Sequence, residues 1–282
     1  MTERSKRMER RIHTDVSPSL ARPKRRTSGT RLLRHVVREV CCYVLTQLPL
    51  FRRMSKARGQ AKGLPIIYVH GYGQSCGSFW ALTRALSALG HGPMFAYNYS
   101  TLNDIDRSAE GLGRFIERVR GATGAPRVDL IGHSMGGVVI AAHLRSAGGE
   151  HNVRRCITLA SAHGGIRWPG PLPGRGAGQL RRGSAYLRNL AIARLPIPVL
   201  NVSSQNDDFV FPATALSEQG TEVNIGDVGH IALLFSEKMF QTAAAFLGEE
   251  EAARSPFVPA DQTYALPEIN PRAAGPELAA TG

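Results

Sequence analysis

Residues 127–144, RVDLIGHSMGGVVIAAHL, decide the fold of this chain. Residues 127–132 form an apolar run that predicts a buried strand, and residues 135–146 have the pattern of a helix. The turn GHSMGG (132–137) joins them. A G-x-S-x-G sequence alone is a weak signal in a chain with 30 glycines. Between a strand and a helix, however, it predicts a sharp turn that presents Ser134 above the edge of a sheet.

Placement at the start of a helix gives Ser134 a chemical role. The backbone N–H of Met135 then faces the position where a negatively charged oxygen develops during attack on a carbonyl. The alternative interpretation is a Gly/Ser turn that only caps the helix at 135–146. We expect Ser134 to be a nucleophile and Met135 to supply one oxyanion donor.

A serine hydroxyl needs a base to remove its proton, and a histidine held by a carboxylate is the usual solution. On a strand-to-helix turn of this kind, the acid and the histidine follow the serine in that order. The sequence NDDFVFP (206–212) follows an expected strand, and His230 follows the next one. We therefore expect His230 to be the base; the alternative is a capping or surface histidine.

Two adjacent carboxylates compete for the role of the acid. Asp207 is favoured because it lies three residues before Val210, whose side chain is expected to pack inward and fix the loop. Asp208 would then be a loop-capping carboxylate. The second oxyanion donor is expected in the sequence HGYGQS (70–75), from the N–H of Tyr72.

Strand and helix patterns alternate through the rest of the chain, which is typical of a parallel sheet covered on both faces. We expect an α/β fold with a mostly parallel sheet of about six strands. The expected strands are 64–70, 93–99, 127–132, 155–160, 197–203 and 222–225, and the expected helices are 78–89, 105–120, 135–146 and 231–247.

Charge is distributed unevenly along the chain. The formal net charge is +13, and residues 1–60 hold 16 of the 35 basic residues but 4 of the 22 acidic ones. The remainder is nearly neutral, so the basicity belongs to an arm rather than to a binding face. We expect no nucleic-acid partner; salt-dependent nucleic-acid binding lost with the arm would contradict this. Of the four cysteines, the adjacent Cys41 and Cys42 suit neither a metal site nor a simple disulfide framework.

Four segments are expected: a disordered tail at 1–30, a helix and linker at 31–63, the catalytic domain at 64–248 and a loose tail at 249–282. Residues 1–51 either pack a helix on the domain or associate with an anionic membrane surface. The expected location is cytoplasmic or peripheral to the inner face of the membrane, with secretion left open. Removing residues 1–50 is predicted to leave kcat on a soluble ester nearly unchanged.

Five stretches resemble bacterial lipases and esterases of the α/β-hydrolase superfamily, over residues 64–247. They are HGYGQS (70–75), GHSMGG (132–137), ITLASAHGG (157–165), NDDFVFP (206–212) and VGHIALLFS (228–236). The resemblance implies an α/β-hydrolase fold and carboxylic-ester hydrolysis through an acyl-enzyme, with no cofactor and no metal. It also implies Asp207 as the acid, because the acid of that family stands in a D-x-x-V pattern. Ala162 and Gly164 depart from a proline and a histidine of the family pattern.

The segment 163–194 is long for a connection in a compact domain, which is typical of lids and binding loops. We expect a lid-like insertion in which Trp168, Tyr186 and Leu187 contact the acyl group of a small-molecule or lipid ester. The alternative is a solvated loop with Trp168 in its own core. Rival functions are a thioesterase, and a non-catalytic protein that binds lipid or a partner through its basic arm.

Overall fold

The computed structural model describes residues 29–47, 63–146, 148–167, 170, 172–191, 195, 197–211 and 220–248. The chain divides into two compact units, Met1–Val36 and Val37–Gly282. Helix α2 (Gly29–Gln47) crosses this division, beginning two residues before the helix expected from the sequence. The predictions for residues 1–28, 48–62 and 249–282, and for Trp168, lie outside the described residues.

Six parallel strands form the sheet of the second unit, in the spatial order β2-β1-β3-β4-β5-β6. The predicted mostly parallel sheet of about six strands is confirmed, and every neighbouring pair in it is parallel. Parallel neighbours require crossover connections, which the helices provide. The strands are β1 (Ile66–Val69), β2 (Met94–Tyr97), β3 (Val128–His133), β4 (Val153–Leu159), β5 (Val199–Ser203) and β6 (Gly220–Asn224).

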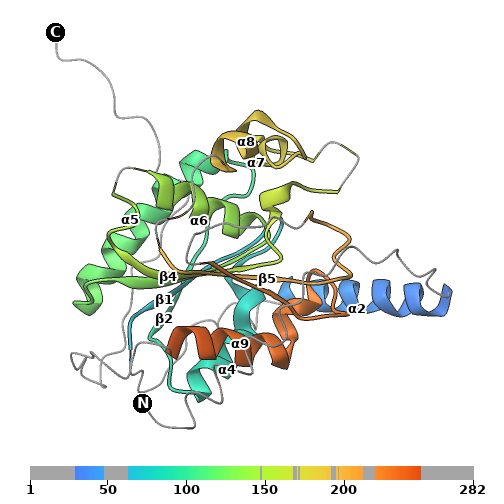
Figure 1. Cartoon of the computed structure of the whole chain (residues 1–282), viewed down its shortest axis with the longest axis horizontal. Helices are drawn as coiled ribbons and strands as arrows, with labels where there is room; N and C mark the ends of the chain where they lie inside the picture. Colours follow the sequence, from blue (N-terminus) through green and yellow to red (C-terminus); the bar gives the residue numbers. More distant parts are fainter. Residues whose placement is uncertain are drawn as a thin grey trace. The chain divides into compact units, whose positions relative to one another are not determined.

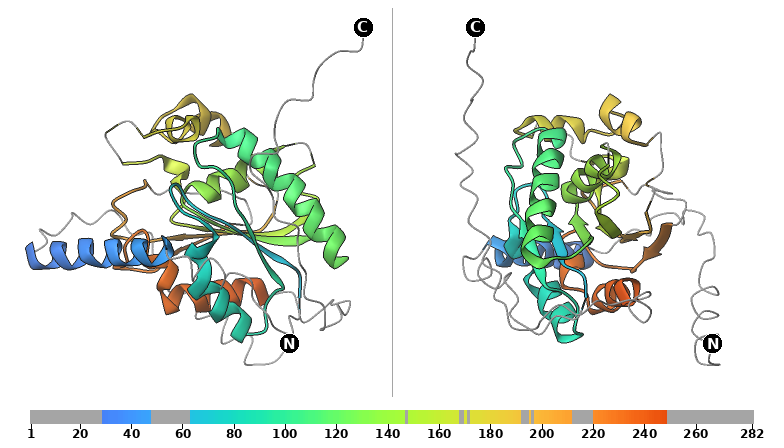
Figure 2. Two further views of the ribbon diagram at one scale, coloured as in Figure 1. Left: turned by 180° about the vertical axis from the view of Figure 1, so that it is seen from behind. Right: turned by 90° about the vertical axis from the view of Figure 1, so that its left-hand side faces the viewer.

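Helices cover both faces of this sheet, as predicted (Figure 1). Helices α5 (Ile105–Thr123) and α6 (Met135–Arg145) lie on one face, and α4 (Trp80–Ala88) and α9 (Glu237–Gly248) lie on the other (Figure 2). The central strands β1 and β3 are buried along their whole length because both of their faces are covered. The edge strand β6 is mostly exposed, which explains its polar composition.

Helix α5 shows how local sequence sets an element. The side chain of Asp104 accepts a hydrogen bond from the N–H of Arg107 at 2.8 Å and caps the first turn. Gly124 ends the helix with φ 69°, a left-handed conformation that glycine adopts without steric cost. Between these caps, one apolar stripe of the helix is buried against the sheet; its residues are Leu112, Phe115, Ile116 and Val119.

Two predicted helices are each broken in the structure. The helix expected at 231–247 is a 3-10 helix, η3 (Ala232–Phe235), followed by α9. Ser236 lies between them with extended backbone, and its Oγ accepts the N–H of Met239 at 3.4 Å, so it caps α9. The helix expected at 78–89 begins with the 3-10 helix η1 (Cys76–Phe79) before α4. Hydrophobic spacing does not distinguish these tighter turns from an α-helix.

Candidate active site

Ser134 lies on a turn whose backbone is strained. It has φ 54° and ψ −119°, a conformation that residues with a side chain rarely adopt. The turn is held by backbone hydrogen bonds, in which the N–H of Ser134 donates to Leu159 O at 2.9 Å and the N–H of Gly137 donates to Ser134 O at 3.2 Å. The serine is partly exposed and immediately precedes α6, so the N–H of Met135 is the first of that helix.

The glycines of this turn are required by close approach of neighbouring backbone. A Cβ on Gly136 would collide with the carbonyl oxygen of Val69, at the end of β1. A Cβ on Gly132 would lie 2.7 Å from the backbone nitrogen of Gly137. Real Cβ atoms do not approach so closely, so the sequence places glycine where helix α6 begins against the sheet.

His230 and Asp207 meet in a buried hydrogen bond. The Nδ1 of His230 donates to Oδ2 of Asp207 at 2.8 Å, and the two side chains are 6% and 7% exposed. His230 lies in the loop before η3, called the histidine loop below. Asp207 lies in the loop after β5, called the acid loop. The contact fixes the histidine with its Nδ1 protonated, which leaves Nε2 as the basic atom.

The loop around Asp207 is built to hold a charged carboxylate. Burial raises the pKa of Asp207, but the charge and hydrogen bond of His230 and the backbone donors of Val210 and Phe209 together bring that pKa below its ordinary value. The N–H groups of Phe209 and Val210 donate to its Oδ1 at 2.9 and 3.0 Å. Asp208, the alternative acid, is exposed.

The loop after β1, the expected oxyanion loop, lies beside Ser134. A Cβ on Gly71 would lie 3.0 Å from the Cβ of Ser134, so this backbone approaches the serine closely. The structure gives the N–H of Tyr72 no acceptor among the described residues, which leaves it able to donate to a substrate. His70 braces the loop: its Nδ1 donates to Gly71 O at 3.0 Å, and burial lowers its pKa to about 4.

His133 joins three parts of the site, a role that the sequence did not reveal. Its Nε2 donates to the backbone oxygen of His230 at 3.1 Å, and its Nδ1 lies 2.9 Å from Oε1 of Gln74 in the loop after β1. Burial, together with the charge of the neighbouring His230, lowers the pKa of His133 to about 3. The residue before Ser134 therefore holds both the histidine loop and the oxyanion loop.

Glu39 is a second residue that sequence reasoning missed. It lies on α2, and its two carboxylate oxygens accept the N–H groups of Ile231 at 2.7 Å and Ala232 at 3.1 Å. These donors directly follow His230. A Cβ on Gly229 would collide with this carboxylate. The available signal was composition, because Glu39 is the only acidic residue between positions 29 and 60.

The described residues of the predicted lid-like segment include two short helices, and a third begins one residue before the segment. They are η2 (Ala162–Gly164), α7 (Arg175–Gln179) and α8 (Ala185–Ala191). Helix α7 approaches the nucleophile turn, since a Cβ on Gly176 would lie 2.6 Å from Cε of Met135. The hydroxyl of Tyr72 donates to Pro173 O at 2.8 Å and ties this segment to the oxyanion loop.

The two described residues predicted to contact an acyl group, Tyr186 and Leu187, point to different surroundings. The hydroxyl of Tyr186 donates to Oδ1 of Asp106 at 2.7 Å, toward α5. Leu187 is 6% exposed and belongs to the hydrophobic core between α5, α6 and the sheet. Leu187 therefore packs inward, and its role toward an acyl group stays a prediction, as does that of Tyr186.

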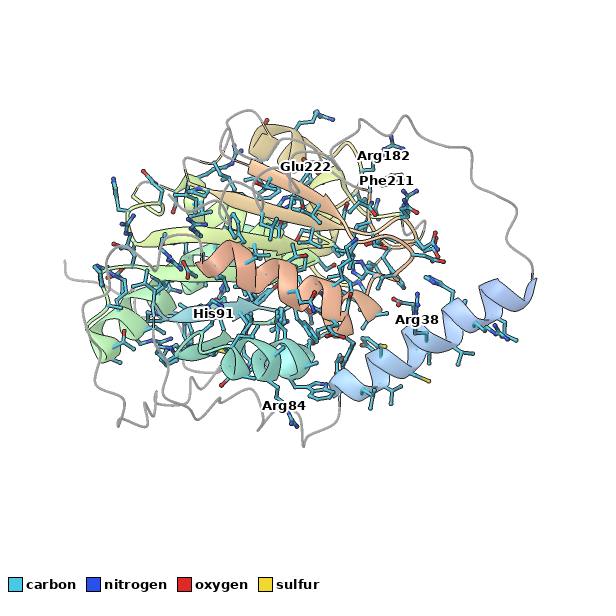
Figure 3. The ribbon with its side chains drawn as sticks, turned by 60° about the horizontal axis from the view of Figure 1, so that its bottom comes forward. Arg38, Arg84, His91, Arg182, Phe211 and Glu222 are labelled. Carbon is cyan, nitrogen blue, oxygen red and sulfur yellow. The ribbon has the colours of Figure 1, made fainter. Side chains whose placement is uncertain are left out.

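Aromatic and cationic side chains lie in and beside the acid loop. The ring of Phe209 lies 5.2 Å from the ring of His230 and is 44% exposed. The guanidinium groups of Arg167 and Arg182 lie 4.1 and 4.2 Å from the ring centre of Phe211. Arg182 and Phe211 are labelled in Figure 3. Within the described residues, no group of three His, Cys, Asp or Glu side chains is arranged to hold a metal ion.

Known proteins share the architecture of this chain. A model of the alpha/beta hydrolase family matches residues 66–268. The chain is similar to the mature form of a lipase from Bacillus licheniformis, with 16% identity and a TM-score of 0.59, covering 68% of this chain and 94% of that one. It is also similar to lipase B of Aspergillus fumigatus, with 14% identity and a TM-score of 0.61, covering 77% of this chain and 60% of that one. At such low identity the structural similarity establishes the fold alone, which is the α/β-hydrolase fold predicted from the sequence.

Proposed function

This chain belongs to the alpha/beta hydrolase family, and from that premise we propose that it cleaves carboxylic esters through an acyl-enzyme on Ser134. Nε2 of His230 takes the proton from Ser134 as its Oγ attacks the ester carbonyl. The carbonyl oxygen becomes negatively charged and accepts the N–H groups of Tyr72 and Met135. His230 then gives its proton to the leaving alcohol.

The second half of the reaction uses the same groups. A water molecule loses a proton to His230 as it attacks the acyl-enzyme, and the carboxylic acid leaves when the proton returns to Ser134. Asp207 keeps the imidazole in the required tautomer and stabilises the imidazolium that forms in each half. No resident metal or cofactor is proposed.

The observation that carries this proposal is the buried contact of 2.8 Å between Nδ1 of His230 and Oδ2 of Asp207. Two further observations support the proposal. The backbone of Ser134 is strained, and His133, which directly precedes Ser134, is hydrogen-bonded to the backbone of His230. A surface or capping histidine would not need a buried carboxylate on one ring nitrogen, because water could satisfy that nitrogen.

The groups around the acid loop favour an apolar substrate. Phe209 leaves nearly half of its surface exposed beside His230, at a position where it can contact the acyl or alcohol part of an ester. Exposed aromatic surface beside a catalytic group costs hydration free energy unless a ligand covers it. We therefore propose esters with a hydrocarbon chain, of esterase or lipase type, as the substrate class.

Covalent labelling by a fluorophosphonate tests the nucleophile. The wild-type protein should give one adduct, mapped to Ser134 by peptide mass spectrometry, and Ser134→Ala should give none. Ser87→Ala, on α4, removes an equivalent hydroxyl elsewhere and should label normally. Folded wild-type protein that forms no adduct would refute the proposal.

A series of p-nitrophenyl esters of increasing acyl length then tests the substrate class. Hydrolysis should require Ser134, with a loss of about 10⁴-fold or more in kcat for Ser134→Ala. Phe209→Ala should raise KM for longer acyl chains more than for acetate. Matched thioesters form the comparison arm, and faster turnover of thioesters at equal chain length would assign a thioesterase instead.

A further inference from the structure

Helix α2 presents two opposite faces within the second unit. One face holds the loops of the candidate active site: besides Glu39, the hydroxyl of Tyr43 donates to Gly73 O at 3.0 Å, and Nε2 of Gln47 donates to the same oxygen at 3.3 Å. Thr46, on this face, is fully buried. The inner face of the helix is therefore fixed against the oxyanion loop and the histidine loop.

The other face is apolar and faces solvent. Val37, Val40 and Val44 are 51%, 55% and 52% exposed. At about 100° per residue they fall within about 60° of one another, and about 100–180° around the helix from Glu39 and Thr46. Single exposed apolar residues are ordinary, but three adjacent valines on one helix face form a stripe that water solvates poorly. Such a stripe is typical of a surface with an apolar partner.

Charge indicates what that partner is. Arg38 lies on the same helix (Figure 3), and residues 1–60 carry 16 basic and 4 acidic side chains. A second copy of the chain would bring the same net positive charge against this helix, and repulsion would oppose pairing. An anionic lipid surface instead attracts the basic side chains while its acyl region accepts the valines.

We propose that α2 is an interfacial helix that docks the protein on an anionic lipid surface through Val37, Val40 and Val44. The valines enter the boundary between headgroups and acyl chains, and the net positive charge of residues 1–60 attracts the anionic headgroups. Among the described residues, no helix is long and apolar enough to cross a membrane. If the proposed ester hydrolysis is right, docking also brings the loops held by Glu39 and Tyr43 to the surface from which a lipidic ester is supplied.

Co-sedimentation of the full chain with vesicles tests this proposal. Phosphatidylcholine vesicles with and without phosphatidylglycerol are compared at low and at high salt. The wild type should bind the anionic vesicles at low salt and lose binding as salt screens the charges. The variant V37Q/V40Q/V44Q should partition about tenfold or more weakly. Glutamine favours helices, so α2 should be kept, and circular dichroism checks that it is.

Leu89→Gln is the matched control. Leu89 is 59% exposed and lies just after α4, so the substitution removes exposed apolar surface away from α2. It should leave vesicle binding unchanged. Equal binding of the wild type and the triple variant would overturn the proposal, as would wild-type protein that fails to bind. A wild-type dimer that the triple variant converts to a monomer would identify a second copy as the occupant, and would also overturn it.

Labelling in solution separates this proposal from the proposed function. The triple variant should react with a fluorophosphonate as the wild type does, because none of the three valines belongs to the site. Vesicle binding without any serine adduct would refute the ester hydrolase and leave the docking helix standing. A serine adduct on wild-type protein that does not bind vesicles would refute the docking helix and leave the ester hydrolase standing.

Discussion

The carboxylate of Glu39 accepts the backbone N–H of Ile231 at 2.7 Å, across 192 residues of sequence. Ile231 directly follows His230, and Glu39 is 8% exposed. A buried carboxylate is stable only where hydrogen bonds replace its hydration, and here the N–H of Ala232 supplies a second one. The N-terminal helix therefore fixes the backbone that carries the candidate base, and Glu39 is a positioning residue.

Replacing Glu39 tests this role. Glu39→Ala leaves two buried N–H groups without their acceptor, so the unfolding free energy should fall by about 1–3 kcal/mol. Displacement of His230 should also lower kcat about tenfold or more, with a smaller change in KM. Glu39→Gln keeps one oxygen acceptor, so its unfolding free energy and its kcat should lie between those of Glu39→Ala and the wild type. Glu110→Ala, an exposed carboxylate on α5, is the control; a loss of stability with unchanged kcat would mean that Glu39 is only structural.

Truncation separates the two parts of the N-terminal region. The sequence alone predicts that removal of residues 1–50 leaves kcat on a soluble ester nearly unchanged. The contacts of Glu39, Tyr43 and Gln47 predict the opposite, because that cut removes three side chains that hold active-site loops. A chain that begins at residue 29 should keep kcat on a soluble ester, and one that begins at residue 51 should lose most of it. Equal kcat for both would contradict the bracing role of α2.

The two adjacent aspartates should differ sharply in their effect on activity. Asp207→Asn removes the negative charge that faces Nδ1 of His230 and permits the wrong imidazole tautomer. As a result, kcat on a soluble ester should fall by about 10⁴-fold. Asp208→Asn should change kcat by less than about threefold, because the carboxylate bonded to His230 is that of Asp207. Comparable losses in the two variants would show that the acid is not uniquely Asp207.

A pair of glycine substitutions tests the nucleophile turn. Gly136→Ala should destabilise the protein by several kcal/mol, about 3 or more, because its Cβ meets the carbonyl of Val69. Gly121→Ala, on helix α5, meets nothing within 4 Å and should stabilise the protein by about 0.5–1 kcal/mol. Thermal and urea unfolding of both variants measures the difference. A tolerated alanine at position 136 would contradict the close approach of α6 to β1.

Buried histidines should make the protein sensitive to acid. Burial, together with the nearby charge of Arg145, lowers the pKa of His163 from its ordinary value of 6.5 to about 4. Between these pH values the unfolded chain binds a proton that the folded protein does not. The unfolding free energy should therefore fall as the pH drops from about 6.5 to about 4.

His163→Leu should reduce the slope of that dependence. Removal of one such group takes away up to about 1.4 kcal/mol per pH unit across this window. Nε2 of His163 is buried and has no hydrogen-bond partner among the described residues, so leucine sacrifices no polar contact there. His151→Leu, at an exposed position, is the control, and urea unfolding at several pH values is the measurement. An unchanged slope in His163→Leu would show that another group controls the acid sensitivity.

The sequence by itself determined the features that depend on neighbours along the chain. Continuous apolar runs identified the buried strands, and helical spacing identified α5 and α6, because burial repeats with the period of each element. The nucleophile turn was visible for the same reason, since a serine between glycines at a strand-to-helix junction is a local steric arrangement. Even so, local periodicity placed one helix at 231–247, where Ser236 in fact separates η3 from α9.

Only the tertiary structure decided which groups meet through space. It paired His230 with Asp207, it made His133 a bridge between two loops, and it placed Glu39 against backbone nearly two hundred residues away. It also resolved the apolar residues of α2 into a face that stays exposed, where the sequence left open whether the helix packs on the domain. These contacts join residues far apart in sequence, and their geometry is set by how the layers pack rather than by any local pattern.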